Sequence, residues 1–447
     1  MVITMSHPPP ASLQAACAHP DSLFTLSEED LLRLVYKEFP QAIDRLKRAY
    51  SLRPRRPSTP PNTRSPSYIL YQQDYDEVNR TLVALLTLRW IHTGQYEILV
   101  GSQSPELRLS ISSFEWIRTF YAQVIKSPND LYILITSVVI NDLGKDPQLA
   151  SDCRALTGKD ISTLNHDAVL LNACTTAPSL IPALAHFSAP EDRDNLISGI
   201  EIGASFNFGQ LAQAENAPAC LSVFQKMKAP RHHHNFQLHF MEQLLDVAGA
   251  AGHLDWTCAK TLIQPVFNAY CDVYDACEGV MAGTLDVRSG YDLVLARRAD
   301  RLHGTGFRLL HVEEDREDRA LMRVLCMGGV TSLDTAQRYE AAWRTLSNAT
   351  REALVNDLNV VGSQDEPAVQ PTYMPALLGS VHDDQRALTC ALEYLARVMG
   401  ATKDLTDSTP VVVERSVLGV LKRYFDNGDF DPTILERVDV PDAVVAL

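Results

Sequence analysis

The sequence predicts an all-α protein, an irregular bundle of helices with at most one small β-hairpin. Apolar residues recur at three- and four-residue spacing in one segment after another, which is the pattern of helices that bury one face. Serine, asparagine and aspartate stand where these segments begin, as helix N-caps do. Only Tyr291–Leu295 and Phe307–Val312 look like strands, and they would form either a hairpin or buried loop.

The N-terminal part of the chain alternates between irregular and helical segments. Residues 1–25 contain prolines and serines, and we expect them to be loosely ordered. Ser27 begins a helix, because three acids and then an apolar stripe follow it. Residues 53–67 are rich in proline and arginine, which predicts an exposed loop. No repeat of 20–50 residues is present, so we expect residues 26–447 to form a single all-helical domain.

The later helices show the same start and stop signals. Asp76–His92 carries leucines at helical spacing and stops at Gly94, Ser113 caps the next helix, and Ser127 with Pro128 starts the central one. The other predicted helices are Gly199–Glu215, Phe236–Ala251, Leu262–Glu278, Asp315–Met327, Ser332–Leu358, Asp383–Met399 and Val411–Phe425.

Composition narrows the class of protein. The chain has 447 residues, 46% hydrophobic and 21% charged, with a formal charge of −15. A negative chain is a poor partner for nucleic acid, whose phosphates attract basic faces. The nine cysteines are scattered and none has CxxC spacing, which favours a reducing, cytoplasmic setting over a zinc or disulfide framework. We see no signal peptide and no apolar run of transmembrane length, so we expect no stable membrane insertion.

The stretch from 131 to 167 carries the strongest functional signal. A dense apolar run ends abruptly on Asn141, Asp142, Lys145 and Asp146, and a second polar group, Asn165-His166-Asp167, opens the next apolar helix. Acids at a helix C-terminus are disfavoured unless a cation compensates them. Lys145 or a bound metal would supply that charge, and oxygen ligands suit Mg²⁺.

Each part of this signal also has a plain structural interpretation. Asp142 and Asp146 would share a helix face, but Pro147 disfavours helix at Asp146, and a polar turn capped by Gly144 is the alternative. Asn165 is a good N-cap, and Asp167 suits a first helical turn.

Three further clusters contain residues that could bind a metal or an anion. The acidic stripe is either a solvated face or a second metal-binding edge, the histidines are either a surface loop or positive charge for an anion, and the arginines suit a diphosphate. These clusters are Asp272, Asp275 and Glu278; His232–His234 with His239; and Arg297, Arg298 and Arg301. No P-loop, GxGxxG or GxSxG motif occurs in its required context.

Several segments resemble an atypical group of fungal class I sesquiterpene synthases, the humulene synthases of tropolone meroterpenoid pathways. The segments are SVVINDLGKD (137–146), STLNHDAVLLNACTTAP (162–178), GIEIGASFNFGQLAQAENAP (199–218) and DEPAVQPTYMPALLGS (365–380). The chain has no DDxxD motif, and Leu211 stands between Asn207 and Glu215 where the NSE triad has Ser or Thr.

The resemblance implies a helical bundle that binds farnesyl diphosphate with Mg²⁺ and forms humulene by ionisation, ring closure at C1 and proton loss. We expect a monomer or a homodimer. It implies Mg²⁺ ligands and catalytic residues among Asp142, Asp146, Asn165 and Asp167. Lys145 and Arg298 would bind the leaving group. Residues that would shape the apolar chain and stabilise the cation are Phe206, Phe208, Tyr270, Tyr274 and Leu285.

Two alternatives stay open. Asn141-Asp142-Leu143-Gly144-Lys145 is similar to the His-Asp-x-Gly-Lys signature of HD-type metal-dependent phosphohydrolases, with Asn141 in place of the metal-binding histidine. His92 and His166 stand where that family has further histidines. The second alternative is a catalytically inactive helical scaffold that binds a partner.

Overall fold

The computed structural model describes residues 12–49, 61–227, 229–401, 411–426 and 433–445. These residues are mostly helical, which confirms the all-α prediction. They form two compact units. Unit 1 comprises residues 1–204 and 229–267, and unit 2 comprises residues 205–228 and 268–447. Each unit is described by itself.

Unit 1 begins with short helices and continues with the helices that carry the central segment. Its elements are α1 (Leu13–Ala16), α2 (Pro20–Phe24), α3 (Glu28–Glu38), α4 (Pro40–Leu46), α5 (Pro66–Tyr71), α6 (Asp76–His92), α7 (Tyr96–Val100), α8 (Ile111–Val124), α9 (Pro128–Ile140), the 3-10 helix η1 (Asn141–Lys145), α10 (Pro147–Thr157), α11 (His166–Thr176), η2 (Pro178–Leu180), η3 (Pro182–His186), α12 (Pro190–Ser205) and α14 (Pro230–Gly249).

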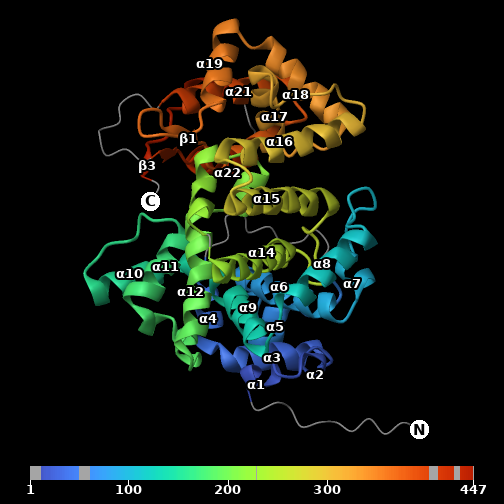
Figure 1. The fold of residues 1–447 in the computed structure, drawn as a ribbon, viewed down its shortest axis with the longest axis vertical. Helices are drawn as coiled ribbons and strands as arrows, with labels where there is room; N and C mark the ends of the chain where they lie inside the picture. The colour runs from blue at the N-terminus through green and yellow to red at the C-terminus, as the bar shows by residue number, and fades with distance from the viewer. Residues whose placement is uncertain (1–11, 50–60, 228, 402–410, 427–432, 446–447) are drawn as a thin grey trace. The chain divides into compact units, whose positions relative to one another are not determined.

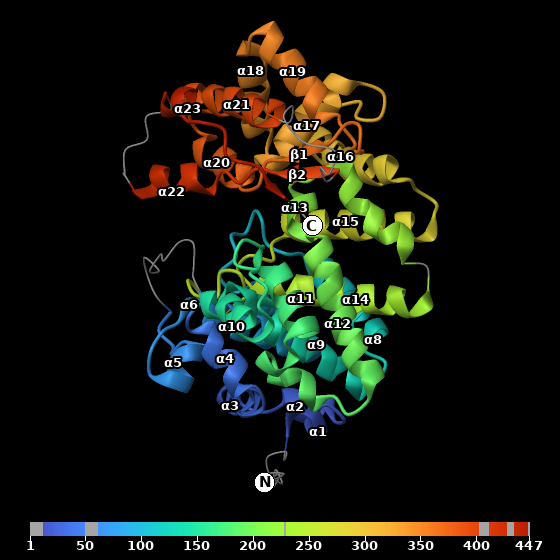
Figure 2. The same cartoon turned by 90° about the vertical axis from the view of Figure 1, so that its left-hand side faces the viewer.

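The core of unit 1 is built on three helices. α6, α9 and α14 pack side by side (Figure 1), and α10 lies next to α11 (Figure 2). α9 forms because Ser127 accepts the N–H of Asp130, Pro128 occupies the first turn, and the residues from Leu131 to Ile140 are mostly buried. The helix then tightens into η1, which brings its polar end to the inside of unit 1.

Unit 2 contains the C-terminal helices and a small sheet. Its elements are α13 (Phe208–Ala212), η4 (Pro218–Lys226), most of α15 (Gln264–Ala282), α16 (Val287–Gly304), α17 (Arg316–Met327), α18 (Leu333–Thr345), α19 (Asn348–Leu358), β1 (Ala368–Gln370), α20 (Met374–Val381), α21 (Gln385–Gly400), β2 (Val412–Glu414), α22 (Leu418–Asp426), α23 (Ile434–Arg437) and β3 (Val444–Val445). The strand order is β1-β2-β3, with β1 and β2 parallel and β2 and β3 antiparallel.

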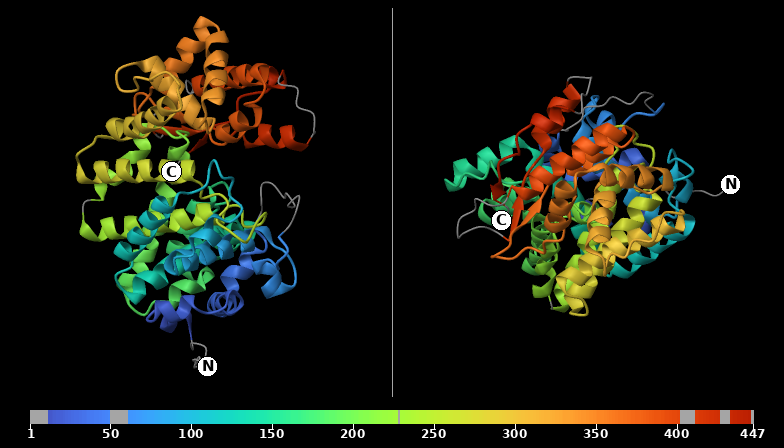
Figure 3. Two further views of the ribbon diagram at one scale, coloured as in Figure 1. Left: turned by 90° about the vertical axis from the view of Figure 1, so that its right-hand side faces the viewer. Right: turned by 90° about the horizontal axis from the view of Figure 1, so that it is seen from above.

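In unit 2, α18 and α19, drawn in orange, pack on α21, drawn in red (Figure 3). A buried guanidinium group in unit 2 connects the segment after α13 to the end of α19. Arg323 on α17 donates to the carbonyl oxygens of Ala214 and Asn216, each over 3.0 Å, and of Leu358 over 3.0 Å. These bonds satisfy carbonyl groups that a helix end or a loop would otherwise leave unpaired.

Several element predictions are wrong in detail. Tyr291–Leu295 lies inside α16, and Phe307–Val312 contains no strand, so the predicted hairpin does not form there. Val411–Phe425, predicted as one helix, divides into β2 and α22. Ser332–Leu358 divides into α18 and α19 because Ser347 caps a new helix, and Ser110 rather than Ser113 caps α8.

The predicted helix over Gly199–Glu215 is also interrupted. α12 ends at Ser205, and Asn207 caps α13 by accepting the N–H of Gln210. Asn207 and Glu215 therefore do not share one helix. Glu215 is buried and instead accepts the backbone N–H of Tyr373 over 2.5 Å.

The two segments predicted to be irregular, 1–25 and 53–67, contain helical residues in the structure. Residues 12–25 form α1 and α2, with Leu13, Leu23 and Phe24 buried, whereas residues 1–11 lie outside the described residues. Of the predicted loop at 53–67, residues 53–60 lie outside the described part, and α5 already begins at Pro66. None of the described helices is long and apolar enough to cross a bilayer.

Candidate functional site

Charged groups, of which Glu77, Asp142 and Glu242 are buried, gather in unit 1 where η1 meets three helices. We call this set the charged cluster. It consists of Glu77 and Arg80 on α6, Asn141, Asp142 and Lys145 on η1, His166 and Asp167 on α11, and Glu242 and Asp246 on α14. The polar end of α9 thus lies within unit 1, as the abrupt end of the apolar run predicts.

Lys145 is the centre of one side of the cluster. Its Nζ lies 2.7 Å from Asp142 Oδ1 and 2.9 Å from Glu77 Oε1. Glu77 also accepts from Arg80 Nη1 over 2.8 Å. Asp142 is 6% exposed and Glu77 is 1% exposed. Carboxylates this deeply buried need such partners, because an unpaired buried charge is strongly destabilising.

The other side of the cluster is formed by α14. The Nδ2 of Asn141 donates to Glu242 Oε1 over 2.7 Å and reaches Asp246 Oδ1 at 3.4 Å. His239 Nδ1 lies 3.3 Å from Glu242 Oε2. The amide of Asn141 therefore joins η1 to two carboxylates that stand four residues apart on one helix face.

The first turn of α11 completes the cluster. His166 Nε2 lies 3.4 Å from Asp167 Oδ1 and 4.0 Å from Asp142 Oδ1. This approach depends on Gly144, because a Cβ at that position would lie 1.8 Å from the carbonyl oxygen of His166. The glycine of the NDLGK segment is thus required by close packing of η1 on α11.

Electrostatics distinguishes the carboxylates of the cluster. Burial opposes the charge of Asp142, but Lys145, then His166 and Arg80, outweigh it and lower the pKa of this carboxyl. Burial opposes the charge of Lys145 as well, and Asp142 and Glu77 more than offset it, so its pKa is raised. Asp142 and Lys145 are therefore a charged pair at neutral pH.

For three other carboxylates of the cluster, burial outweighs the nearby cations. Burial, and then the negative charge of Asp142, raise the pKa of Asp246 to about 7. Burial is also the main cause that raises the pKa of Glu77 and of Asp167. Burial therefore favours the protonated form of these groups, and the local cations do not fully offset it.

The structure brings together three of the predicted site residues of the central stretch. Asp142, Lys145 and Asp167 belong to the charged cluster. Asp146, in contrast, is 0% exposed and is bound by Arg45 Nη1 at 3.0 Å and by Arg48 Nη2 at 2.6 Å, and it caps α10. Asn165 caps α11 by accepting the N–H of Ala168 over 2.9 Å.

Apart from Lys145, the predicted substrate-binding residues lie in unit 2. Phe206 and Phe208 pack edge to face, with ring centroids 5.2 Å apart, and Phe208 stacks on Tyr270 at 6.2 Å. Tyr274 lies one turn further along α15, and Leu285 packs against Gly279. Arg298 is buried and donates to the carbonyl oxygen of Val330 over 3.4 Å.

The other predicted clusters are bound within the protein. Arg301 binds Asp272 through two bonds of 2.5 and 2.6 Å, and Arg297 lies 2.5 Å from Asp275. Of the histidines, His234 lies 2.9 Å from Asp130. His92, which the phosphohydrolase alternative places at the site, contacts Tyr121 and Asp21 over 3.2 and 2.8 Å.

Four of the nine residues of the charged cluster, those on α6 and α14, were not predicted from the sequence. A signal was present in both helices. Glu77 and Arg80 interrupt the apolar helix α6, of which nearly every residue is buried, and Glu242 and Asp246 follow a buried apolar run in α14. Charged residues on the buried face of a helix require partners, but the partners lie far away in the sequence.

The chemistry of the cluster suits a hard cation. Its ligands would be carboxylate oxygens, as Mg²⁺ prefers, and five acids (Glu77, Asp142, Asp167, Glu242 and Asp246) face two permanent cations, Arg80 and Lys145. Burial is the main cause of the raised pKa of Asp246, and the negative charges of Asp142 and Glu242 add to it. Among the described residues, however, no three His, Cys, Asp or Glu side chains stand close enough to hold a metal ion as they are arranged.

Comparison with known proteins identifies a family but no characterised relative. Neither the curated proteins nor the solved structures contain a match to this chain. One family model matches residues 32–435, which is most of the chain and includes all of the charged cluster. The chain therefore belongs to the family of unknown function DUF6829.

Proposed function

We propose that this protein is a Mg²⁺-dependent sesquiterpene cyclase that converts farnesyl diphosphate to humulene in the cytoplasm, as a monomer or homodimer. The observation that carries the proposal is the charged cluster at the end of α9. It contains Asp142 and Lys145, within the NDLGK segment that takes part in the resemblance to fungal humulene synthases.

In this proposal the acidic residues of the cluster bind the metal ion and the basic residues bind the diphosphate. Asp142, Asp167, Glu242 and Asp246 would hold Mg²⁺ only after moving closer together, since no three of them stand close enough as they are arranged; the bound ion would neutralise the charge that grows on the leaving diphosphate. Lys145 remains protonated and would donate a hydrogen bond to a diphosphate oxygen. Arg80, with its raised pKa, keeps a second positive charge near Glu77 and Asp142.

The chemistry after ionisation requires an apolar and water-free surface. Breaking the C1–O bond transfers the electron pair to the diphosphate and leaves an allylic cation. Attack by the distal double bond on C1 closes an eleven-membered ring, and loss of one proton to the diphosphate gives the neutral hydrocarbon. Each desolvated aromatic ring that faces the chain would stabilise the cation by ~1–2 kcal/mol.

A direct assay tests this proposal. Purified protein incubated with farnesyl diphosphate and Mg²⁺ should release a C15 hydrocarbon, detected by gas chromatography of the headspace, and one equivalent of inorganic diphosphate. EDTA should abolish both products. Release of farnesol or inorganic phosphate without hydrocarbon would reject the cyclase and favour hydrolysis.

One observation favours a second candidate, a divergent HD-type phosphohydrolase. His166 Nε2 lies 4.0 Å from Asp142 Oδ1. Asp246 on α14 is close enough to Asp142 for the charge of Asp142 to raise its pKa, so a histidine and two aspartates belong to one cluster. An imidazole beside a carboxylate suits general acid–base catalysis of phosphate-ester hydrolysis. A panel of nucleotides and phosphate monoesters with Mg²⁺ or Mn²⁺ tests it, and His166→Gln should then abolish phosphate release. If none of these substrates is converted and Mg²⁺ does not raise the melting temperature, the inactive scaffold is the remaining hypothesis.

A further inference from the structure

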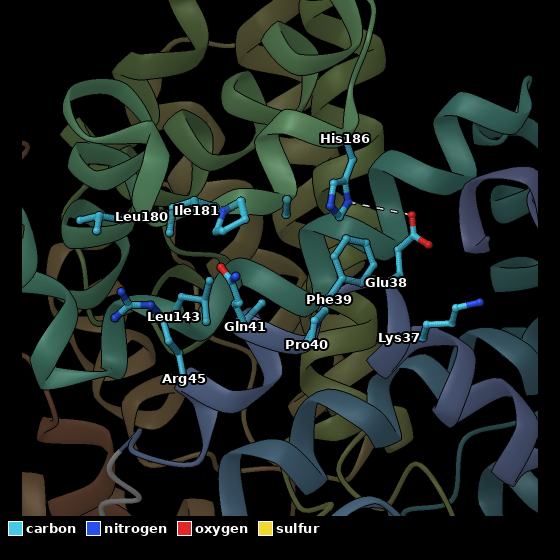
Figure 4. A pocket seen from close by; sticks show the side chains of 13 residues that line it. Lys37, Glu38, Phe39, Pro40, Gln41, Arg45, Leu143, Leu180, Ile181 and His186 are labelled. Atoms are coloured by element: carbon cyan, nitrogen blue, oxygen red, sulfur yellow. Dashed lines mark ion pairs between the residues drawn. The ribbon is translucent and has the colours of Figure 1, made fainter. Parts of the chain in front are cut away.

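A pocket in unit 1 is separate from the charged cluster. It has a volume of about 210 Å³, and η1 borders both, because Leu143 faces the pocket while Asp142 and Lys145 belong to the cluster. α4 and the end of α3 form one wall and η2 and η3 the other. Side chains that define it are Phe39, Gln41, Arg45, Leu143, Ile181 and His186 (Figure 4).

A chain of hydrogen bonds fixes His186 at one end of this pocket. Glu38 Oε2 accepts the N–H of Leu13 over 3.0 Å, and Glu38 Oε1 accepts the hydroxyl of Tyr132 over 3.0 Å. The oxygen of Tyr132 lies 2.9 Å from His186 Nδ1. The imidazole also stacks on Phe39, with ring centroids 5.6 Å apart. Both the position and the plane of the ring are therefore determined by the protein.

The same bonds determine which nitrogen of His186 carries the proton. Burial and the charge of Glu38 raise the pKa of Tyr132, so it remains a phenol with one proton. Because Tyr132 gives that proton to Glu38, His186 Nδ1 must be the donor to the phenol oxygen. Neutral His186 then has a lone pair on Nε2. In Figure 4 one ring nitrogen of His186 is directed to Glu38 and the other to the side of Ile181, into the pocket.

The charges around the pocket decide the class of ligand. Arg45 is already bound to Asp146 and Asp152, and Lys37 points away from the pocket in Figure 4. The charges of Arg45 and Glu38 are thus already compensated by partners within the protein, so a charged ligand would lose its hydration without gaining a new ion pair from either of them. A neutral hydroxyl avoids this cost and can donate to His186 Nε2. Leu143, Leu180 and Ile181 would cover the apolar body.

We propose that this pocket binds a small apolar alcohol, whose hydroxyl donates to His186 Nε2 and whose hydrocarbon part packs on Leu143, Leu180 and Ile181. The site is independent of the proposed cyclase activity, because none of its contacts involves the charged cluster. A hydrogen bond between neutral groups contributes ~0.5–1.5 kcal/mol, so an alcohol should bind about two- to tenfold more tightly than an ether of similar size.

The test uses the full chain labelled with ¹⁵N at histidine, with 1-octanol as the probe. The ring signals of His186, assigned with His186→Gln, should show a proton on Nδ1, and octanol should shift its Nε2 signal. His92 is the internal control, because Tyr121 and Asp21 already occupy both of its nitrogens. Octyl methyl ether should bind two- to tenfold more weakly, and Leu180→Asp should remove binding of both.

Three results would overturn the proposal: a proton on Nε2 of His186, equal affinity for octanol and the ether, or tighter binding of octanoate or octylamine. Octanol binding that persists in Leu180→Asp, with an unchanged circular dichroism spectrum, would place the alcohol elsewhere. Because no activity is measured, failure of the cyclase assay does not affect this test.

Discussion

At the scale of single residues, the account depends on how Lys145 holds two buried carboxylates. Its ammonium group bridges Asp142 and Glu77 at 2.7 and 2.9 Å, on the inside of unit 1. The bridge explains why a helix can end in acids on a buried side. Lys145 therefore stabilises the fold, and in the proposed reaction it also binds the leaving group.

Removal of the Lys145 charge should therefore destabilise the protein. Lys145→Met leaves Asp142 and Glu77 buried with Arg80 as the main remaining cation, and loss of one partner of a buried pair costs about 3–5 kcal/mol. Urea denaturation measures the change in the free energy of unfolding. Lys159→Met is the control, because the ammonium group of Lys159 donates to the side chain of Asn172 at an exposed position. This variant should change the free energy of unfolding by less than about 0.5 kcal/mol. Equal stability of the two variants would contradict the bridge.

The second residue-scale prediction concerns Asp246. Its pKa is raised to about 7, so it is largely protonated at pH 6 and ionised at pH 8. A protonated carboxyl binds cations poorly, and Mg²⁺ should therefore raise the melting temperature more at pH 8 than at pH 6. Asp246→Asn should remove most of this difference. A Mg²⁺ effect that is constant across this pH range would exclude Asp246 as a ligand.

At the scale of elements, close packing of η1 on α11 positions the cluster. Gly144→Ala would place a Cβ 1.8 Å from the carbonyl oxygen of His166, so η1 or α11 has to move. We expect a loss of about 2–4 kcal/mol in the free energy of unfolding, because overpacking against backbone cannot be relieved by a rotamer change. Gly199→Ala is the matched control, since nothing lies within 4 Å of its added Cβ and alanine favours helix by up to ~1 kcal/mol.

A destabilised Gly144→Ala with a stable Gly199→Ala would establish the close approach. If both variants are at least as stable as the parent protein, η1 does not pack on α11 as the structure shows.

The connection between α13 and α20 in unit 2 predicts a pH effect on stability. Burial raises the pKa of Glu215 to about 8, although the N–H of Tyr373 opposes this rise. The folded state therefore binds a proton that the unfolded state releases near pH 4.5. Stability should fall as pH rises from about 5 to 8, by up to about 1.4 kcal/mol per pH unit from this group.

Glu215→Gln keeps an oxygen for the N–H of Tyr373 but cannot ionise. Melting temperatures measured from pH 5 to 8 should thus fall less steeply for Glu215→Gln than for the parent protein. Identical slopes would show that Glu215 does not titrate in this range.

At the scale of the whole molecule, helices with strong local signals could be predicted from the sequence. Asp76–His92 has the predicted bounds, and the starts of α3 and α9 at Ser27 and Ser127 follow from capping and first-turn residues. Breaks inside apolar segments could not be predicted. Asn207 and Ser347 end one helix and start another, and a single polar residue in a periodic pattern gives only a weak signal for this.

The candidate site was predictable only in part, for a related reason. Asp142 and Lys145 stand out because they end an apolar run. Glu77 and Asp246 join them through the packing of α6 and α14 on η1, across 65 and 104 residues of sequence. Asp146 shows the converse, since its partners Arg45 and Arg48 come from α4 and the segment after it and make it a structural residue. Local spacing indicates that a carboxylate is unusual but does not identify its partner.

The central claim is that Asp142 serves diphosphate ionisation as well as the fold. The most direct test is the rate of Mg²⁺-dependent hydrocarbon release from farnesyl diphosphate by Asp142→Asn, compared with Asp160→Asn, which changes an exposed carboxylate of the same unit. We predict a loss of at least about 100-fold for Asp142→Asn, comparable to the loss of a single electrostatic catalytic group, with full activity for Asp160→Asn. Full activity in a folded Asp142→Asn, or no hydrocarbon from the parent protein, would contradict the account.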